Sequence, residues 1–227
     1  MGSGTLKGRR AVVFDLDGTL VDTAPDLAGA LNRLLAEERR EPLPLDAVKL
    51  LIGDGAGRLV QRAFFGDRPA LPDKMAELTR RYLLHYARHE ADLSQPYPGV
   101  AECLAGLIDA GHVLGVCTNK PQAPALKLLE HFGLGDFFTA VVGGDQMHGV
   151  RKPDPRHLEA VLDALGVGSS DAVFVGDNEN DARVAHAVGL PLVIVSFGYA
   201  RVPIPDLGAN AVINTYADLP AALAALS

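Results

Sequence analysis

Short, uninterrupted apolar runs recur along the chain, and they are the first pattern that predicts its structure. Most carry β-branched or small apolar residues with no alternation of apolar and polar positions. That pattern is typical of parallel strands that are covered on both faces. We expect strands at residues 11–14, 113–117, 140–142, 172–175, 192–195 and 211–213.

Between these runs, apolar residues recur at helical spacing. The pattern predicts helices at residues 100–110, 124–132, 156–165 and 181–188, and a short closing helix in the alanine-rich tail at 221–225. A chain in which strands and helices alternate favours a Rossmann-like, doubly wound α/β core, with helices on both faces of a parallel sheet.

Residues 23–93 do not alternate in this way. Their apolar positions keep helical spacing throughout, interrupted by the glycine-rich stretch 53–57, and Pro25 marks a helix start. We therefore expect an α-helical cap domain inserted after the first strand. The predicted division is a catalytic core of residues 1–22 and 94–227 and a cap of residues 23–93, with hinges near 21–24 and 94–99.

The composition excludes several classes of protein. The 227 residues are 48% hydrophobic and 22% charged, as in a globular protein, and the net charge of −7 with no basic run argues against a nucleic-acid partner. No apolar stretch is long enough to span a membrane, and the first residues lack the apolar region of a signal peptide. Cys103 and Cys117 lie in apolar patterns and are expected to be buried thiols, so the cytoplasm is the expected location.

The most informative polar residues come directly after the first strand. Asp15 and Asp17 are two residues apart, so in extended geometry they share a face, and Gly18 permits a sharp turn after them. Two like charges this close in a buried setting are costly unless a cation or strong donors compensate for them. Such a pair is either an energetically unfavourable feature without a function or a metal-dependent active site.

Polar residues also follow three other predicted strands. Ligands of open α/β sheets bind beyond the carboxyl ends of the strands, so these positions are expected to converge. Carboxylates follow two of the strands and phosphate-type donors follow the other two. The segments are 15–19, 118–121, 151–153 and 176–181.

These motifs, in this order, resemble those of the haloacid dehalogenase superfamily of phosphohydrolases. The resemblance covers the chain from about residue 10 onward. Within the superfamily the chain is similar to the phosphoglycolate phosphatases, through residues 15–27, 52–56, 97–100 and 118–121, with further agreement at 143–145, 151–153 and 197–199.

The resemblance implies a role for each acidic residue. Asp15 would be the nucleophile that forms an aspartyl phosphate, and Asp17 the acid and base that serves the leaving oxygen and then the attacking water. Asp15, the backbone carbonyl of Asp17 and the carboxylate of Asp177 would hold one Mg²⁺, an ion that prefers oxygen ligands. Asp181 would hold a metal-bound water or orient Lys152, although an acidic residue is also favourable at a helix start.

The same resemblance implies that Thr118, Asn119 and Lys152 bind the phosphate oxygens. Lys120 and Arg151 are expected to be peripheral charges.

In the cap, Gly53, Asp54, Gly55 and Arg58 are candidates for substrate specificity, with Arg58 pairing with a substrate carboxylate. The same loop could equally be a helix–helix turn with a solvated arginine. Asp54 stands where these relatives commonly carry Asn, and would place a negative charge near an anionic substrate.

The expected activity is hydrolysis of a small phosphorylated metabolite with Mg²⁺, with 2-phosphoglycolate as the leading substrate and a monomer or homodimer as the assembly. A phosphatase for pyrophosphate, a phosphosugar or an amino-sugar phosphate shares every core residue and differs only in the cap. A mutase of the β-phosphoglucomutase kind is disfavoured by Thr19 after Gly18 and by Leu27, where those mutases carry His. A catalytically silent binding protein would have no physical need for the carboxylate cluster.

Overall fold

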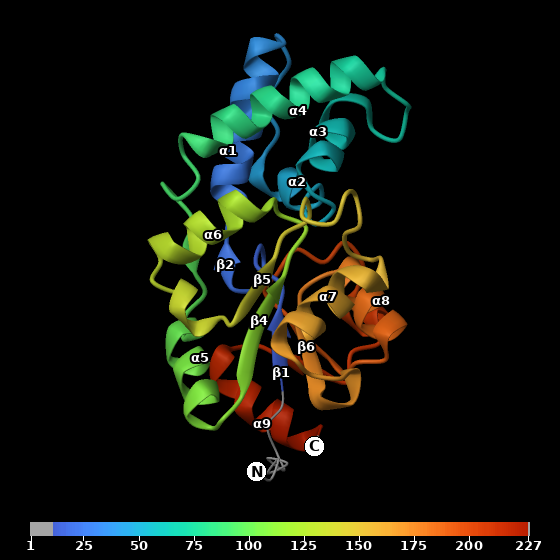
Figure 1. Ribbon diagram of the computed structural model, residues 1–227. Coiled ribbons are helices and arrows are strands. Elements are labelled where there is room, and N and C mark those ends of the chain that lie inside the picture. Colours follow the sequence, from blue (N-terminus) through green and yellow to red (C-terminus); the bar gives the residue numbers. More distant parts are fainter. Residues whose placement is uncertain (1–10, 227) are drawn as a thin grey trace.

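The computed structural model describes residues 11–226, which contain a six-stranded parallel sheet with the order β5-β4-β1-β6-β7-β8 (Figure 1). The strands are β1 (Ala11–Phe14), β4 (Val113–Cys117), β5 (Ala140–Val142), β6 (Ala172–Gly176), β7 (Leu192–Val195) and β8 (Ala211–Ile213). The predicted strands are confirmed, and β6 runs one residue further than expected. Residues 1–10, which the sequence assigns to the core, lie outside the described part.

The strand order reverses beside β1. From the β1 region the chain builds β4 and β5 on one side, then crosses to β6, β7 and β8 on the other. Phe14 is in register with Val116 of β4 and with Val175 of β6, so these three strands end at nearly the same level. In sheets of this kind the crevice at such a reversal is where ligands bind.

Helices cover both faces of the sheet, as the alternation of elements predicts. They are α5 (Val100–Asp109), α6 (Gln122–His131), α7 (Pro155–Leu165), α8 (Glu179–Val188) and α9 (Leu219–Ala225), with short 3-10 turns η1 (Gly135–Phe137), η2 (Ser169–Asp171), η3 (Ile204–Leu207) and η4 (Tyr216–Asp218). The predicted helices are confirmed with ends shifted by at most two residues. For α8 the cause is a capping box between Asn178 and Asp181, which starts the helix at Glu179.

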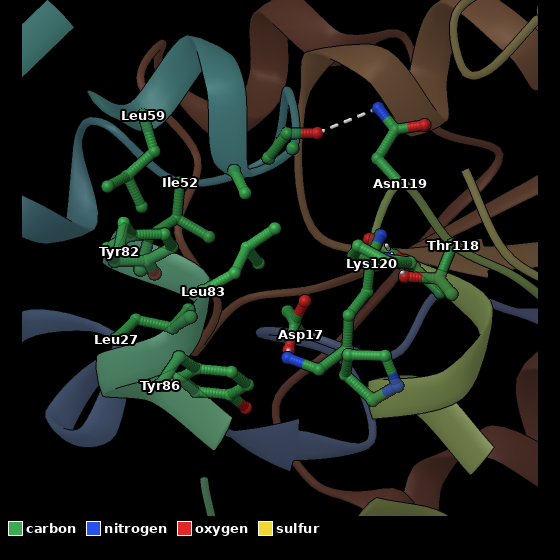
Figure 2. Close-up of a pocket in the computed structure, with 16 residues that line it drawn as sticks. Asp17, Leu27, Ile52, Leu59, Tyr82, Leu83, Tyr86, Thr118, Asn119 and Lys120 are labelled. Carbon is green, nitrogen blue, oxygen red and sulfur yellow. Dashed lines mark hydrogen bonds and ion pairs between the residues drawn. The ribbon is translucent and has the colours of Figure 1, made fainter. Parts of the chain in front are cut away.

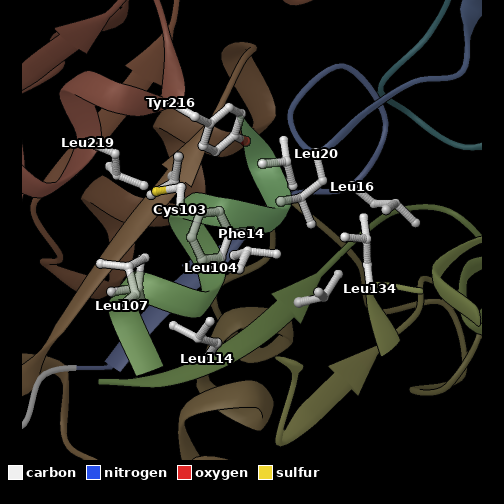
Figure 3. Packing of buried hydrophobic residues seen from close by; sticks show 14 of the residues in the cluster. Phe14, Leu16, Leu20, Cys103, Leu104, Leu107, Leu114, Leu134, Tyr216 and Leu219 are labelled. Carbon is white, nitrogen blue, oxygen red and sulfur yellow. The ribbon is translucent and has the colours of Figure 1, made fainter. Parts of the chain in front are cut away.

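The side chains of each strand divide between two hydrophobic clusters. Val12 and Phe14 of β1 pack into the cluster that α5, α6 and α9 cover, part of which Figure 3 shows. Ala11 and Val13 face the opposite cluster, under α7 and α8. Because both faces of β1, β6 and β7 are buried, these strands are apolar along their length, which is why their sequences show no alternation.

Residues 24–87 form a separate group of helices, which we call the helical segment. It consists of α1 (Ala24–Glu37), α2 (Leu45–Lys49), α3 (Ala56–Phe65) and α4 (Pro72–Ala87). In Figure 1 it lies at the upper end of the molecule, beyond the sheet. Its buried residues, among them Leu31, Leu34 and Leu78, form their own hydrophobic cluster, so the segment is packed around a core of its own.

The two chain connections to the helical segment lie side by side. β2 (Val21–Asp22) precedes α1 and β3 (Gln95–Pro96) follows α4, and the two pair as a short antiparallel ribbon. The sequence marks both places as boundaries but does not predict strands there, because two residues are too few to show a periodicity.

Two expectations about the whole chain can be compared with the described residues. Within residues 11–226, no helix has both the length and the apolar character needed to cross a membrane. Cys103 and Cys117 are buried and carry free thiols, as expected from the apolar patterns around them.

Truncation of a core side chain is expected to destabilise the protein much more than truncation of an exposed one. Leu104 of α5 is completely buried, whereas Leu126 of α6 is 45% exposed. Leu104→Ala should lower the free energy of unfolding by about 2–5 kcal/mol, and Leu126→Ala by less than about 1 kcal/mol. Chemical denaturation of both variants measures the difference, and equal losses would contradict this packing.

Candidate active site

The loop after β1 begins the site. Asp15 follows the last residue of β1, and its backbone N–H donates to the Val175 carbonyl at 2.9 Å, which extends the β1–β6 pairing by one step. The chain then turns at Gly18, whose φ of 83° lies in the left-handed region that glycine tolerates. Asp15 and Asp17 therefore both remain at the end of the sheet.

The structure brings three of the predicted carboxylates together. Asp15, Asp177 at the end of β6 and Asp181 in the first turn of α8 each offer an oxygen, and these oxygens all lie within 4.8 Å of one another. All three residues are almost completely buried. The Asp177 carboxylate accepts hydrogen bonds from the Tyr199 backbone N–H at 2.6 Å and from the Asn178 side chain at 2.8 Å.

Asp181 is held in place through both of its oxygens. Its Oδ2 accepts from the backbone N–H groups of Asp177 at 2.9 Å and Asn178 at 3.1 Å, which closes the capping box of α8. Its Oδ1 accepts from Lys152 Nζ at 2.7 Å. The prediction that Asp181 orients Lys152 therefore corresponds to a direct contact, and its position at the helix start is part of the same arrangement.

Lys152 lies between two of the carboxylates. The Lys152 side chain is 1% exposed, and its Nζ lies 2.8 Å from Asp15 Oδ1. Burial alone would lower the pKa of Lys152, but the charges of Asp15 and Asp181 raise it above its ordinary value, so the side chain is an ammonium ion. The Lys152 backbone N–H donates to His157 Nδ1 at 3.1 Å; burial and the nearby ammonium lower the pKa of His157 to about 4 and keep the ring neutral.

Electrostatics indicate that this cluster lacks positive charge. Burial raises the pKa of the Asp15 carboxyl to about 7, with the charge of Lys152 opposing the rise and that of Asp181 adding to it. Burial also raises the pKa of Asp177 well above its ordinary value, and the charges of Asp181 and Asp15 add to that rise. Three carboxylates share one ammonium ion, so the oxygen-rich cluster fits a hard divalent cation that would keep them ionised.

Thr118 and Asn119 lie at the end of β4, beside this cluster. Thr118 Oγ1 accepts from the Lys120 backbone N–H at 3.2 Å, so its own hydrogen can be donated to a ligand. The Asn119 amide donates to the carbonyls of Lys152 and Gly53, both at 2.9 Å. The side chain of Asn119 thus connects two loops, and its backbone N–H is the group that can face an anion.

The expectation that Lys120 is a peripheral charge is wrong. The residue is 6% exposed, and its Nζ donates to Asp17 Oδ1 at 3.0 Å. Thr23 Oγ1 donates to the same carboxylate oxygen at 2.7 Å. The sequence contained a usable signal, because Lys120 follows the same strand end as Thr118 and Asn119. Arg151, by contrast, is half-buried.

A pocket separates this site from the helical segment (Figure 2). The core contributes polar residues to its wall, and the helical segment contributes mainly apolar and aromatic ones. The polar residues are Asp15, Asp17, Thr118, Asn119 and Lys120; the apolar and aromatic ones include Leu27, Ile52, Leu59, Tyr82, Leu83 and Tyr86. The two parts of the chain therefore enclose one cavity.

Of the predicted specificity residues, Gly53 and Gly55 line this pocket. Arg58 does not, and its guanidinium donates to the side chain of Gln61 at 2.7 Å on the exposed side of α3. The Gly53 carbonyl accepts from Asn119 and from Asn180, at 2.9 and 3.2 Å. The glycine loop is thereby fastened to the core by its backbone.

Asp54 does not add an uncompensated charge near the pocket, contrary to expectation. Its carboxylate is 2.5 Å from Arg62, 2.6 Å from Arg201 and 2.7 Å from the side-chain amide of Asn180. Although burial raises its pKa, the hydrogen bonds from Arg201 and Asn180 and the charges of both arginines lower the pKa to about 2. Asp54 therefore joins the helical segment to the core through a neutralised charge cluster.

Sequence reasoning gave no role to Tyr199 or Gly198, although both lie in a segment that resembles the phosphoglycolate phosphatases. The Tyr199 hydroxyl donates to Asp22 at 2.5 Å and accepts from the Ala24 backbone N–H at 3.0 Å. Gly198 packs directly against Asp177, and a Cβ atom there would overlap the Asp177 side chain and lie 2.7 Å from the Gly18 carbonyl. This segment holds the Asp177 carboxylate in position.

Comparisons with known proteins identify the family and the relatives of this chain. The model of a family described as haloacid dehalogenase-like hydrolase matches residues 12–195. Phosphoglycolate phosphatases of Rhodospirillum rubrum and Caulobacter vibrioides are 48% and 47% identical to the chain, over 92% and 93% of it and 89% of each relative. A crystal structure described as a predicted phosphoglycolate phosphatase from Haemophilus somnus superposes with a TM-score of 0.87 at 30% identity, covering 94% of this chain and 97% of that one.

A methyl group at position 198 is expected to disrupt the carboxylate cluster. In Gly198→Ala the new Cβ would displace Asp177, and we expect a loss of about 1–3 kcal/mol in the free energy of unfolding. Gly106→Ala is the matched control, because Gly106 lies within α5 with open space where a methyl group would project, and alanine is the better helix former. Chemical denaturation should show a loss for the first variant and none for the second; the reverse order would contradict the close approach of Gly198 to Asp177.

Proposed function

The chain belongs to the haloacid dehalogenase-like hydrolase family, and from this premise we propose that it is a Mg²⁺-dependent phosphatase that converts 2-phosphoglycolate to glycolate and phosphate. The observation that carries the proposal is the cluster of Asp15, Asp177 and Asp181 at the end of the sheet, with Lys152 in contact with Asp15 and Asp181. The identity to phosphoglycolate phosphatases over most of both chains supports the choice of substrate.

In the proposed domain organisation, residues 1–22 and 94–227 form the catalytic core and residues 23–93 form the cap. The support is the separate hydrophobic cluster of the helical segment and the pairing of β2 with β3, which brings both connections to one place. The cap would exclude water from the pocket during reaction and open to release the products.

The proposed reaction proceeds in two displacements at phosphorus. An Asp15 carboxylate oxygen forms a bond to phosphorus while the bond from phosphorus to the ester oxygen breaks, and Asp17 gives its proton to that oxygen as glycolate leaves. Asp17 then takes a proton from a water molecule, whose oxygen forms a bond to phosphorus while the bond from phosphorus to the Asp15 oxygen breaks. Phosphate is released and the Asp15 carboxylate is restored. Acid and base assistance of this kind contributes about 10²–10⁴ in rate.

Thr118, Asn119 and Lys152 are proposed to bind the phosphate oxygens. The Thr118 hydroxyl and the Asn119 backbone N–H supply neutral donors, and Lys152 supplies a positive charge that is already fixed by Asp15 and Asp181. Fixed donors stabilise the developing charge without reorganising during the reaction.

The Asp15 and Asp177 carboxylates and the Asp17 backbone carbonyl are proposed to hold Mg²⁺. All three are hard oxygen ligands of the kind this ion prefers. When bound, the ion supplies the positive charge that offsets repulsion between the carboxylates and the phosphate. Asp181 would keep its contacts with Lys152 and with the backbone of α8.

Removal of the nucleophile tests the reaction. Asp15→Asn should lower kcat by at least about a thousandfold while leaving the melting temperature near that of the parent protein, because the amide matches the carboxylate in shape. The measurement is phosphate release from 2-phosphoglycolate with Mg²⁺, alongside Asp171→Asn, an exposed control just before β6. Near-normal turnover by Asp15→Asn would refute the assignment.

The choice of substrate needs a separate measurement. A panel of 2-phosphoglycolate, pyrophosphate, a phosphosugar and an amino-sugar phosphate, ranked by kcat/KM, should place 2-phosphoglycolate first. If another member ranks first, the phosphatase assignment remains and the substrate assignment falls.

The dependence of metal binding on pH follows from the raised pKa values of Asp15 and Asp177. Without metal, the folded protein holds protons that the unfolded chain has lost, so these groups lower stability as the pH rises from about 4 to 7. Mg²⁺ must displace those protons, and its affinity should rise by up to about tenfold per pH unit for each proton displaced.

The gain in melting temperature on adding Mg²⁺, relative to EDTA, should thus be larger at pH 7.5 than at pH 5, and Asp177→Asn should abolish this gain. An equal gain at both pH values would contradict the site.

A further inference from the structure

The pocket contains a cation that the phosphoryl-transfer chemistry above does not use. Among the described residues that line the pocket, Lys120 has the only positively charged side chain. Arg58 borders two neighbouring cavities instead, and Arg62 and Arg201 are paired with Asp54. Any further negative charge on a ligand in this pocket would therefore meet Lys120 first.

The position of Lys120 is fixed from both parts of the chain. Its Nζ donates to Asp17 Oδ1 at 3.0 Å and lies 4.5 Å from the centre of the Tyr86 ring of α4. Figure 2 shows this ammonium group between Asp17 and Tyr86 at the inner side of the pocket. An ammonium ion has three donors, so Asp17 leaves capacity for a second acceptor.

The chemistry of the substrate connects Asp17 with Lys120. In a 2-phosphonooxy carboxylate, the carboxyl carbon is bonded to the carbon that carries the ester oxygen. Asp17 must reach that ester oxygen to protonate it, so the substrate carboxylate necessarily comes close to Asp17. Once Asp17 has given up its proton, two carboxylates lie at this distance, and they repel each other unless a cation lies beside them. Lys120 lies at that place.

Resting on the proposed function, we propose that Lys120 binds the carboxylate of the substrate and thereby selects phosphate esters of small 2-hydroxy acids over uncharged esters. Lys120 is thus a specificity-determining residue, and it replaces Arg58, which the sequence favoured for this contact. The charge would act on binding of the substrate in its ground and transition states alike, so this part of its loss should appear in KM, whereas loss of the contact with Asp17 should lower kcat for both substrates.

The remaining wall of the pocket fits a small acid. The Tyr82 hydroxyl, which is buried without a hydrogen-bond partner among the described residues, is one polar group there, whereas Leu27, Ile52 and Leu59 offer no hydrogen bonds from their side chains. The hydroxyl groups of a sugar placed against them would lose water without gaining partners, which is unfavourable. A two-carbon acid has no such hydroxyl groups and satisfies its carboxylate at Lys120.

The experiment compares two substrates on the same enzyme preparation. For 2-phosphoglycolate and for ethyl phosphate, which lacks the carboxylate, kcat and KM are measured on the full chain and on Lys120→Met. The ratio of the two kcat/KM values should fall by about 10- to 100-fold in the variant, the size expected for a lost hydrogen bond to a charged group. The fraction of folded enzyme cancels in this ratio, so partial unfolding does not imitate the effect.

Three further variants make the result specific. Lys127→Met, an exposed lysine of α6 paired with Glu90, is the matched control and should leave the ratio unchanged. Lys120→Gln repeats the loss of charge with a polar side chain, in case the methionine variant folds poorly. Arg58→Met tests the competing assignment, and a fall of the ratio in this variant rather than in Lys120→Met would overturn the inference.

Other outcomes separate this inference from the proposed function. If Lys120→Met lowers both substrates equally, Lys120 only positions Asp17 and the inference is overturned. If the parent protein hydrolyses both esters equally well, the inference fails while phosphatase activity stands. If the parent protein hydrolyses neither ester with Mg²⁺, the proposed function fails and the inference fails with it.

Discussion

The arrangement of the whole site depends on one buried ammonium group, that of Lys152. It touches Asp15 and Asp181, and both contacts are almost completely removed from water. Replacing Lys152 with a neutral residue would leave both carboxylates buried without a positive partner, which costs about 3–5 kcal/mol. Because the cluster also includes Asp177, the negative charges still exceed the positive ones. The excess negative charge can be balanced by protons, which the raised pKa values of Asp15 and Asp177 reflect, or by the divalent cation proposed for this site.

The sheet supplies the conditions for this cluster. Phe14, Val116 and Val175 are in register, so the loops after β1, β4 and β6 leave the sheet at the same level. The strand order reverses beside β1, and the crevice there admits side chains from three separate stretches of the chain. The apolar strands pack tightly on both faces, and this rigid base holds the charged groups close together despite their repulsion. Stability of the core and chemistry of the site are connected in this way.

The helical segment is fastened to this base by polar contacts and by Tyr199 of the core, which packs into the segment's hydrophobic cluster. Asp54 pairs with Arg201, and the Gly53 carbonyl accepts from Asn119 and Asn180. Lys120 adds a contact between Asp17 of the core and Tyr86 of α4. Contacts of this kind can be exchanged for water at modest cost, so they suit the proposed role of this segment as a cap that would close over a ligand and open again. The same contacts shape the pocket, and through it the proposed choice of substrate.

The sequence by itself determined the parallel sheet, the helices on both faces and the carboxylates and donors at the strand ends. Periodicity is a local property, and the carboxyl ends of parallel strands must lie at one edge, so Asp15, Lys152 and Asp177 could be assigned to one site. Only the tertiary structure decided how individual side chains are paired. It buried Lys120 against Asp17, turned Arg58 toward Gln61 and neutralised Asp54 with Arg62 and Arg201. The direction of a long charged side chain depends on partners far away in the chain, and no local pattern of residues contains that information.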